Sequence, residues 1–483
     1  MKKAAPKFSV EEVLRATGGE VISKSSTVKR FCGISTDSRA VAPGNLFVAL
    51  KGENFDGHDF VREVLEKEAA GVLIQDEEKV VPFLTRENTA IIRVADTLIA
   101  LGDLAHDWRK RFSALVIALT GSSGKTTTKE MIASIMTRKK DILKTEGNLN
   151  NLIGLPQTIL EMTKKHEAVI LEMGTNTRGE IKRLTQIASP DISLITNVGP
   201  AHLAGLGSLD AVRDEKCDLF LNMSRNGTAV INLDDEAILA GSERWDGKRV
   251  TFSMGTGADV TAAQIEKQGL KGISFRLVIG GRDKEVMMKI AGMHHVYNAL
   301  AAAATASAAG MDLETIAEGL AAFVPFSGRM EVIKLQNGAY LLDDSYNANP
   351  ASVREALMAL KDLKGQRNGY VFLGDMLELG SQAEEMHRKI GMLIATVGIT
   401  ALFLQGDFSP ITAAGAIEGG LVPENIFFLS RQEEDMDYLK KHLKKGDWIL
   451  VKGSRRMKME AYVQKICEVF GCNRSNHQLE TVT

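Results

Sequence analysis

The residues with the clearest chemical potential lie in one glycine-rich stretch, Thr120-Gly-Ser-Ser-Gly-Lys-Thr-Thr127. The apolar run Ala114–Leu119 precedes it, and a helix-like pattern from Met131 to Met136 follows it. In such a strand–loop–helix unit, loop amides and the helix N-terminus face a phosphate, the lysine bridges terminal phosphates and the next hydroxyl holds Mg²⁺. Leu119 stands where the full Walker pattern has glycine, so the chain carries a shorter form. We predict an ATP site formed by Gly121, Ser122, Ser123, Gly124, Lys125, Thr126 and Thr127, which we favour over an incidental Gly/Ser turn.

Three further residues after this loop could take part in phosphate chemistry. Glu172 ends the apolar run Ala168–Leu171, the position of a metal-binding acid, although a solvated strand-end glutamate would also fit. His202 follows the strand-like run Ile192–Thr196, and it is either a metal or phosphate contact or a structural histidine. The spacing around Lys216 predicts only a surface lysine.

Polar clusters also follow strand-like runs in the last third of the chain. Asp343-Asp-Ser-Tyr-Asn-Ala-Asn-Pro350 joins two carboxylates to a tyrosine, which a structural turn does not need, so it indicates a ligand site. Lys452-Gly-Ser-Arg-Arg456 suits a carboxylate, because arginine binds carboxylates through paired hydrogen bonds. Near the N-terminus, Ser35-Thr-Asp-Ser-Arg39 suits a sugar nucleotide or phosphate, but its spacing alone favours a capped turn.

Length and composition limit the class of protein. The 483 residues predict about three domains. A formal net charge of −2 provides no basic surface for nucleic acid, and no apolar run reaches the roughly 18 residues that span a bilayer. The basic start lacks the apolar core of a signal peptide, and the four cysteines suit neither a disulfide framework nor a zinc site. We therefore expect a cytoplasmic protein, without membrane insertion, and nothing in the sequence demands more than a monomer.

Strand-like and helix-like runs alternate along the chain, which predicts an α/β fold of three domains. The first domain spans residues 1–96, and the second, 97–324, is a P-loop parallel-sheet ATPase domain with hairpins appended at 250–290. The third domain, 325–483, is doubly wound and Rossmann-like. Ligands bind beyond the carboxyl edge of parallel sheets, and the clusters described above lie after strands.

Together these motifs resemble the Mur ligase family, which makes amide bonds in cell-wall precursors with ATP. The resemblance covers essentially the whole chain and rests on residues 120–127, 147–156, 197–202, 292–302 and 328–330. Within the family, residues 343–350, 374–380 and 452–455 are most similar to members that attach D-alanyl-D-alanine to UDP-N-acetylmuramoyl-tripeptide. The resemblance implies that the first domain holds the UDP-muramoyl peptide, the second ATP and Mg²⁺, and the third D-alanyl-D-alanine while closing over ATP.

The resemblance also implies roles for single residues. It implies that Thr126, Glu172 and His202 bind metal. It also implies that Lys216 is carbamylated and lies beside the second metal, although its spacing predicts a surface position. Nucleotide contacts would be Asn298, Arg329 and either Asp343 or Asp344. Substrate contacts would be Ser38, Arg39, Asn148, Asn151, Asn176, Asn347, Asn349, Lys452 and Arg455. His295 stands where the family usually has asparagine, so no role follows for it.

The implied reaction explains the residue types. A carboxylate becomes reactive towards an amine once ATP has converted it to an acyl phosphate, and phosphoryl transfer needs positioning and charge neutralisation rather than a protein nucleophile. The alternatives are a sibling ligase that adds a single amino acid, a folylpolyglutamate-type ligase, a kinase, and an ATP-dependent switch that does not ligate. The Asp343–Pro350 segment argues against the first two, and Lys125, Glu172, His202 and Lys216 argue against the switch.

Overall fold

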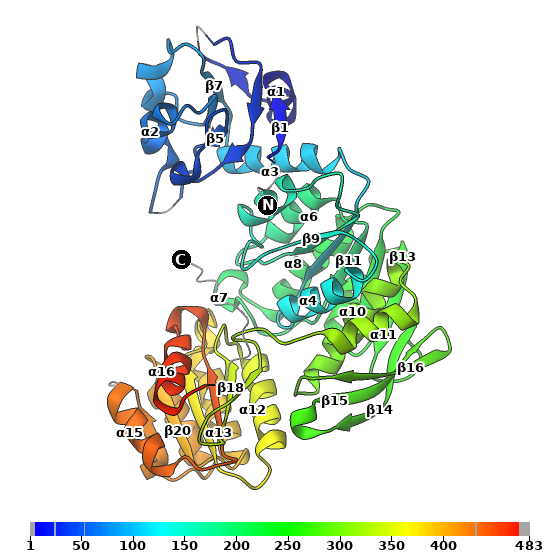
Figure 1. Cartoon of the computed structure of the whole chain (residues 1–483), viewed down its shortest axis with the longest axis vertical. Helices are drawn as coiled ribbons and strands as arrows, with labels where there is room; N and C mark the ends of the chain where they lie inside the picture. Colours follow the sequence, from blue (N-terminus) through cyan, green and yellow to red (C-terminus); the bar gives the residue numbers. More distant parts are fainter. Residues whose placement is uncertain (1–4, 24–25, 53, 430–431, 473–483) are drawn as a thin grey trace.

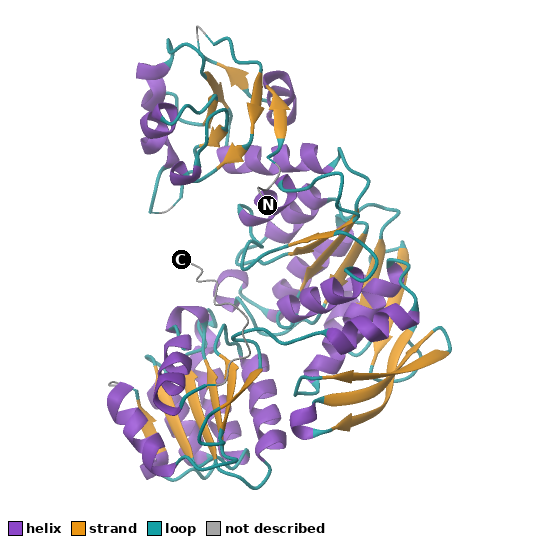
Figure 2. Ribbon diagram, viewed as in Figure 1, coloured by secondary structure: helices purple, strands orange, loops and turns teal. Residues whose placement is uncertain are grey.

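The protein is seen in a computed structural model that describes residues 5–23, 26–52, 54–429 and 432–472. Three sheets follow one another along the chain, each covered by helices (Figures 1 and 2). The predicted three-domain α/β fold is confirmed. The boundaries that we placed at residues 96/97 and 324/325 stay predictions.

The first sheet has five strands in the order β2-β7-β6-β5-β4, of which β2 is antiparallel to its neighbour and the rest are parallel. A two-stranded pair, β1 and β3, lies beside it. The elements are β1 Lys7–Ser9, α1 Val10–Thr17, β2 Glu20–Val21, β3 Arg30–Cys32, β4 Ile34–Ser35, β5 Leu46–Val48, α2 Val61–Glu66, β6 Gly71–Ile74 and β7 Ala90–Arg93.

The central sheet has nine strands in the order β16-β15-β14-β13-β12-β11-β8-β10-β9. All pairings from β9 to β14 are parallel, and β14, β15 and β16 form the antiparallel hairpins expected at 250–290. The strands are β8 Leu115–Thr120, β9 Ile142–Lys144, β10 Ala168–Glu172, β11 Ile192–Ile195, β12 Thr228–Asn232, β13 Lys248–Ser253, β14 Val260–Lys267, β15 Ile273–Ile279 and β16 Arg282–Met288.

Helices cover both faces of the central sheet. The alanine-rich residues 298–308 lie in α10, and their small side chains are almost entirely buried. Small side chains let helices approach closely: at Gly319 of α11 a Cβ would lie 2.5 Å from Cα of Ile135 in α4. The helices are α3 Thr97–Arg109, α4 Lys125–Met136, α5 Gly154–Leu160, α6 Glu180–Ala188, α7 Leu203–Leu206, α8 Leu209–Leu221, α9 Glu236–Ser242, α10 His294–Ala308 and α11 Leu313–Ala322.

The third sheet has six strands in the order β17-β18-β22-β19-β20-β21, all parallel except the edge strand β17. This order, with helices on both faces, is the doubly wound arrangement that the sequence predicted. The elements are β17 Glu331–Lys334, β18 Tyr340–Asp344, α12 Pro350–Lys364, β19 Gly369–Gly374, α13 Ala383–Thr396, β20 Ala401–Gln405, α14 Ser409–Glu418, β21 Ile426–Phe428, α15 Gln432–His442, β22 Trp448–Lys452 and α16 Glu460–Phe470.

Two cysteines correct the sequence interpretation. Cysteine usage indicated no disulfide framework, yet Cys467 in α16 and Cys472 are joined by a disulfide. The turn after the helix brings their Cα atoms to 5.0 Å, a spacing that a disulfide can bridge and that composition does not reveal. Cys32 and Cys217 are free.

No helix in the described ranges combines the length and apolar character that a bilayer span requires.

Candidate active site

Most of the predicted site residues meet in one cavity of about 360 Å³ between the central and C-terminal sheets, whereas Gly121, Lys216 and Asp343 are not part of its lining. It lies at the carboxyl ends of β8 and β10 in the central sheet and of β18 and β22 in the third, the edge where parallel sheets bind ligands. The predicted residues that line it are Ser122, Ser123, Gly124, Lys125, Thr126, Thr127, Asn148, Asn151, Glu172, Asn176, His202, Asn298, Arg329, Asp344, Asn347, Asn349, Lys452 and Arg455.

Contacts with Thr196 and Asn197 fix the conformation of the glycine loop. Gly121 and Gly124 have positive φ angles, and a Cβ at Gly121 would lie 1.9 Å from Thr196 Oγ1. The amides of Ser122 and Ser123 donate to the carbonyl and side chain of Asn197. The helix α4 begins at Lys125, so its first amides lack carbonyl partners within the helix and are oriented to bind an anion.

The phosphate-loop lysine and hydroxyl face the cavity. Lys125 Nζ donates to the carbonyl of Gly121 at 2.7 Å, which folds the side chain back over the loop. Thr126 Oγ1 accepts from Arg329 Nη2 at 3.3 Å, so a cation that follows the central domain in sequence reaches the loop. Burial lowers the pKa of Lys125; the charge of Glu172 opposes this shift and that of Arg329 adds to it. The loop therefore presents cations where a polyphosphate would bind.

Glu172 ends β10 and is almost fully buried, with 3% of its surface exposed. Its Oε1 accepts from Asn150 Nδ2 at 2.9 Å, whereas Oε2 has no hydrogen-bond partner in the described part of the chain. The nearest cation is Lys129, with its Nζ 3.9 Å from Oε2. A buried carboxylate oxygen without a hydrogen bond fits the oxygen donor set of Mg²⁺, together with the hydroxyl of Thr126.

No group of three or more His, Cys, Asp or Glu side chains in the described residues is arranged to hold a metal ion. Magnesium commonly takes one or two carboxylates and completes its shell with waters and substrate phosphates. The donor set around Glu172 is therefore compatible with Mg²⁺ in the presence of a nucleotide.

His202 lies in a left-handed turn at the start of α7 and contacts the C-terminal domain. Its Nδ1 is 2.7 Å from Glu378 Oε2, and this contact is the main cause of the lowered pKa of Glu378. Backbone atoms reinforce the contact, because the amide of Ala204 donates to the carbonyl of Glu378 at 3.1 Å. Motif spacing could not identify Glu378 as the partner of His202, because 176 residues separate them.

The position of Lys216 contradicts the surface location that its spacing predicts. Lys216 is not a surface lysine but lies within the domain with 1% of its surface exposed, because that side of α8 faces the sheet. Burial, reinforced by the positive charge of Lys125, lowers the pKa of Lys216 to about 7. A substantial fraction of this amine is therefore neutral, and nucleophilic, at physiological pH.

The two neighbouring aspartates of the third domain have different surroundings. Asp343 Oδ1 accepts from the amide and hydroxyl of Ser345, and Oδ2 accepts from the Gly328 amide. Asp344 lines the cavity and pairs with Lys452, a buried cation that also donates to the carbonyl of Asn347 at 3.0 Å. Of the pair, Asp344 is the residue placed to contact a ligand.

The remaining predicted residues of this domain make polar contacts, of which that of Asn349 reaches the central domain. Asn349 caps α12, and its Nδ2 donates to the carbonyl of Ser122 in the phosphate loop at 3.1 Å. Asn347 Oδ1 accepts from the Arg455 amide at 3.2 Å. Tyr346 lies between two guanidinium groups, 4.1 Å from that of Arg329 and 5.3 Å from that of Arg455.

Ser38 and Arg39 lie in the N-terminal domain and do not line this cavity. Arg39 is exposed and pairs with Asp37 at 2.8 Å, and the carbonyl of Ser38 accepts from Lys67 Nζ. A hydrogen bond of 2.7 Å from Gln157 Nε2 to Thr36 Oγ1 links their motif to the central domain.

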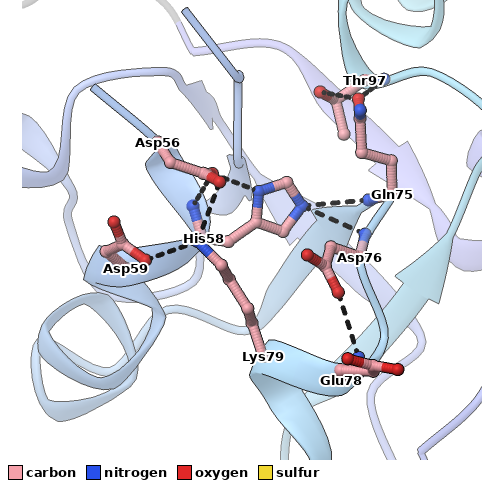
Figure 3. A network of polar contacts seen from close by, with 8 residues as sticks. All are labelled: Asp56, His58, Asp59, Gln75, Asp76, Glu78, Lys79 and Thr97. Carbon is pink, nitrogen blue, oxygen red and sulfur yellow. Dashed lines mark hydrogen bonds and ion pairs between the residues drawn. The ribbon is translucent and has the colours of Figure 1, made fainter. Parts of the chain in front are cut away.

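A second polar cluster of the N-terminal domain is structural (Figure 3). The ring of His58 is buried; its Nδ1 contacts Asp56 at 2.6 Å and its Nε2 accepts from the Gln75 amide at 3.0 Å. Lys79 then bridges Asp56 and Asp59. Both ring nitrogens of His58 are thus used within the domain, as expected for a capped turn rather than a ligand contact.

Several residues that line the cavity lie outside the predicted set, among them Asn150, Glu180, His294 and Glu355. Asn150 and Glu180 belong to segments near the predicted asparagines, and Asn150 could have been found because it shares their motif. His294 and Glu355 lie on helices α10 and α12, where nothing in the spacing separates them from ordinary helical residues. Asn151 also has a structural role, since its Oδ1 accepts from the amide of Gly154 at 2.9 Å.

A phosphate loop, a buried carboxylate beside it and a second α/β domain that completes the same cavity define a nucleotide-dependent enzyme of the P-loop class. Comparison with known families specifies the class. Residues 119–306 match the Mur ligase middle domain, residues 328–455 match the Mur ligase glutamate ligase domain, and residues 30–109 match the catalytic domain of the Mur ligase family. The chain belongs to the Mur ligase family.

Individual relatives agree with this assignment. The chain is 36% identical to the UDP-N-acetylmuramoyl-tripeptide–D-alanyl-D-alanine ligase of Bacillus subtilis, over 90% of this chain and 93% of the relative. It is 35% identical to the ligase of the same name from Escherichia coli, over 91% and 94% of the two chains. The crystal structure of MurF from Acinetobacter baumannii superposes with a TM-score of 0.88 at 32% identity, covering 96% of this chain and all of that one (100%). MurF ligase from Thermotoga maritima, solved in complex with ADP, gives a TM-score of 0.79 at 26% identity, covering 90% and 97%.

Proposed function

We propose that this enzyme joins D-alanyl-D-alanine to UDP-N-acetylmuramoyl-tripeptide with the energy of ATP. The products are the UDP-muramoyl pentapeptide, ADP and phosphate, so the reaction serves peptidoglycan synthesis. The observation that carries the proposal is the single cavity in which Lys125 and Glu172 of the central domain meet Asp344 and Lys452 of the C-terminal domain. The relatives named for this reaction, at 35–36% identity over nine-tenths of the chain, support the choice of substrates.

The chemistry proceeds in two steps. The tripeptide carboxylate attacks the γ-phosphorus of ATP, and ADP leaves, giving an acyl phosphate. The amine of D-alanyl-D-alanine then attacks the acyl carbon, and the tetrahedral intermediate expels phosphate while the nitrogen loses a proton. Lys125 and the first amides of α4 neutralise charge on the transferred phosphoryl group, and Arg329 adds a cation from beyond the central domain.

We infer that the site uses Mg²⁺ held by Thr126 and Glu172. When bound, Mg²⁺ would neutralise phosphate charge and orient the γ-phosphoryl group. His202 would serve a second metal through Nε2, since Nδ1 contacts Glu378. Lys216 would join it as a carbamate: its neutral amine adds to CO₂ and releases a proton, which turns a buried cation into a carboxylate-like ligand.

The remaining residues would contact the nucleotide or one of the two other substrates. Asn298, packed against Gly124, would contact adenine, and Asp344 would contact the ribose. Ser38 and Arg39 would hold the UDP-sugar, while the asparagines at 148, 151 and 176, which line the cavity, would lie along its route to the phosphate loop. Asn347, Asn349, Lys452 and Arg455 would lie near the dipeptide. We place the reaction in the cytoplasm and the enzyme as a monomer.

The test is phosphate release from ATP with UDP-muramoyl-tripeptide, with and without D-alanyl-D-alanine, and mass analysis of the product. Release that depends on the dipeptide, with a product heavier by the dipeptide less one water, is the expected result. Release triggered by a single amino acid would instead make the protein a sibling ligase. Release without any acceptor would indicate an ATP-dependent switch, and a persistent phosphorylated product would indicate a kinase.

A further inference from the structure

One carboxyl group in the cavity has no role in the reaction described above. Glu355 lies on α12, is partly buried, and lines the cavity beside Asp344 and Lys452. Within the described residues, its carboxyl group takes part in no hydrogen bond or ion pair, whereas Asp344 is held by Lys452. Beside Asp344 the site therefore contains a second acid whose carboxyl oxygens face the cavity without a partner among the described residues.

The position of Glu355 limits which part of a ligand it can contact. The phosphate loop, with Lys125 and Thr126, is the part of the cavity that suits phosphates, and two carboxyl groups would repel a phosphate there. Asp344 and Glu355 instead come from β18 and α12 of the other domain. A nucleotide whose phosphates occupy the loop carries its next polar groups, two neighbouring hydroxyls, on the ribose. Carboxylates bind such hydroxyls as hydrogen-bond acceptors, as the acidic residue of dinucleotide-binding folds does.

The charge state of the group is compatible with this role. Burial raises the pKa of Glu355 to about 7, an effect that Lys452 opposes and Asp344 increases. Lys452 is the cation paired with Asp344, and His294 on the facing helix α10 is neutral, since burial and then Lys452 lower its pKa to about 3. A hydroxyl that donates a hydrogen bond to Glu355 would favour its ionised form, so binding of the ligand would itself shift Glu355 towards the carboxylate that accepts the bond.

We propose that Glu355 is a specificity-determining residue that accepts a hydrogen bond from a ribose hydroxyl of the nucleotide, next to the contact made by Asp344. This inference rests on the proposed ATP-dependent function. It adds a second carboxyl acceptor, so the enzyme would distinguish ribonucleotides from deoxyribonucleotides more strongly than with Asp344 alone.

The test measures dissociation constants by calorimetry for Mg·ATP, Mg·2′-deoxy-ATP and Mg·3′-deoxy-ATP, without acceptor substrates. We compare the wild-type enzyme with Glu355→Ala and Glu355→Gln, and Glu384→Gln on α13 is the matched control because that glutamate is exposed. We expect Glu355→Ala to weaken ATP binding about 10-fold and to leave binding of one deoxy analogue almost unchanged. Glu355→Gln, which keeps an oxygen acceptor without the charge, should lose less. Thermal unfolding checks that each variant is folded.

Equal weakening of all three nucleotides by Glu355→Ala would overturn the inference, because the effect would not depend on a ribose hydroxyl. A higher KM for D-alanyl-D-alanine with unchanged ATP binding would overturn it too, and would assign Glu355 to the dipeptide. The binding measurement is independent of ligation. If wild-type phosphate release showed no dependence on the dipeptide, the proposed function would fail while the test of Glu355 still gave an answer.

Discussion

The central domain meets its two neighbours through different kinds of contact. With the N-terminal domain it shares one continuous apolar core, in which Phe8 and Val13 belong to the same cluster as Leu101 of α3 and Val169 of β10. The C-terminal domain has two apolar clusters of its own, and no described residue of the central domain belongs to either. It meets the central domain through polar side chains such as those of Arg329, Asn349 and Glu378.

This difference separates stability from catalysis. Burial of apolar surface stabilises the interface between the N-terminal and central domains. Separating these domains would expose that apolar surface to water and lose its stabilisation. Partly exposed polar contacts contribute little net free energy, because water replaces them when the domains separate. We therefore expect the N-terminal and central domains to move together, while the C-terminal domain opens and closes over the nucleotide.

The largest effect on activity should come from a change in the phosphate loop, at the polar interface between the central and C-terminal domains. Lys125→Ala removes the cation that would neutralise the transferred phosphoryl group, so kcat should fall on the order of 10²–10³-fold. Dipeptide-dependent phosphate release measures this, and Lys164→Ala at an exposed position is the control. The melting temperature should stay near that of the wild type; a large decrease would mean that the polar side also carries stability.

The apolar interface should respond in the opposite way. Leu101→Ala leaves a cavity in a fully buried part of the shared core and should lower the free energy of unfolding by about 2–5 kcal/mol. At a temperature where the variant is folded, its kcat should match the wild type. Ile99→Ala, on the exposed side of the same helix, is the control. Calorimetry should show the N-terminal and central domains unfolding in one transition, and two separate transitions would contradict a shared core.

The buried amine of Lys216 allows a test of whether its carbamylation depends on pH. Lys216→Ala should lower activity about 10–100-fold, with Lys182→Ala on the exposed side of α6 as the control. Because the pKa of Lys216 is lowered to about 7, the amine is mostly protonated at pH 6 and mostly neutral at pH 8. After removal of CO₂, the rate at which a fixed concentration of dissolved CO₂ restores activity should rise from pH 6 to pH 8 and then level off. A rate independent of pH would exclude carbamylation.

The smallest effect should come from the contact between the two domains at His202. Glu378→Gln removes the charge from a partly exposed pair, so the free energy of unfolding should change by about 1 kcal/mol or less. Small-angle scattering should nevertheless show a larger average radius for the variant without ligands. A non-hydrolysable ATP analogue with both substrates should make the wild type more compact, and an unchanged radius would count against domain closure.

Much of this molecule could be predicted from local sequence. Hydrophobic runs predicted β8, β10 and β18, because buried parallel strands are almost wholly apolar. The phosphate loop was equally clear, since its glycines and Lys125 are needed at fixed spacing. Motifs placed Glu172 and Asp344 at strand ends, and the cavity brings both together.

Other properties depend on residues that are distant in the sequence. The spacing of Lys216 indicates a surface position, but the packing of α8 buries it and lowers its pKa. Asp343 and Asp344 are adjacent and chemically identical, yet the strand pleat sends them to opposite faces, so that Asp344 lines the cavity. Glu355 has no motif, and only the packing of α12 against β22 brings it near Lys452.

The sequence by itself thus determined the fold class, the phosphate loop and the set of polar side chains at the strand ends, because propensity, periodicity and motif spacing act over a few residues. The tertiary structure decided which of those side chains are buried, paired or left for a ligand. Burial, pairing and pKa depend on what surrounds a group in space, and most of those neighbours come from other elements of the chain.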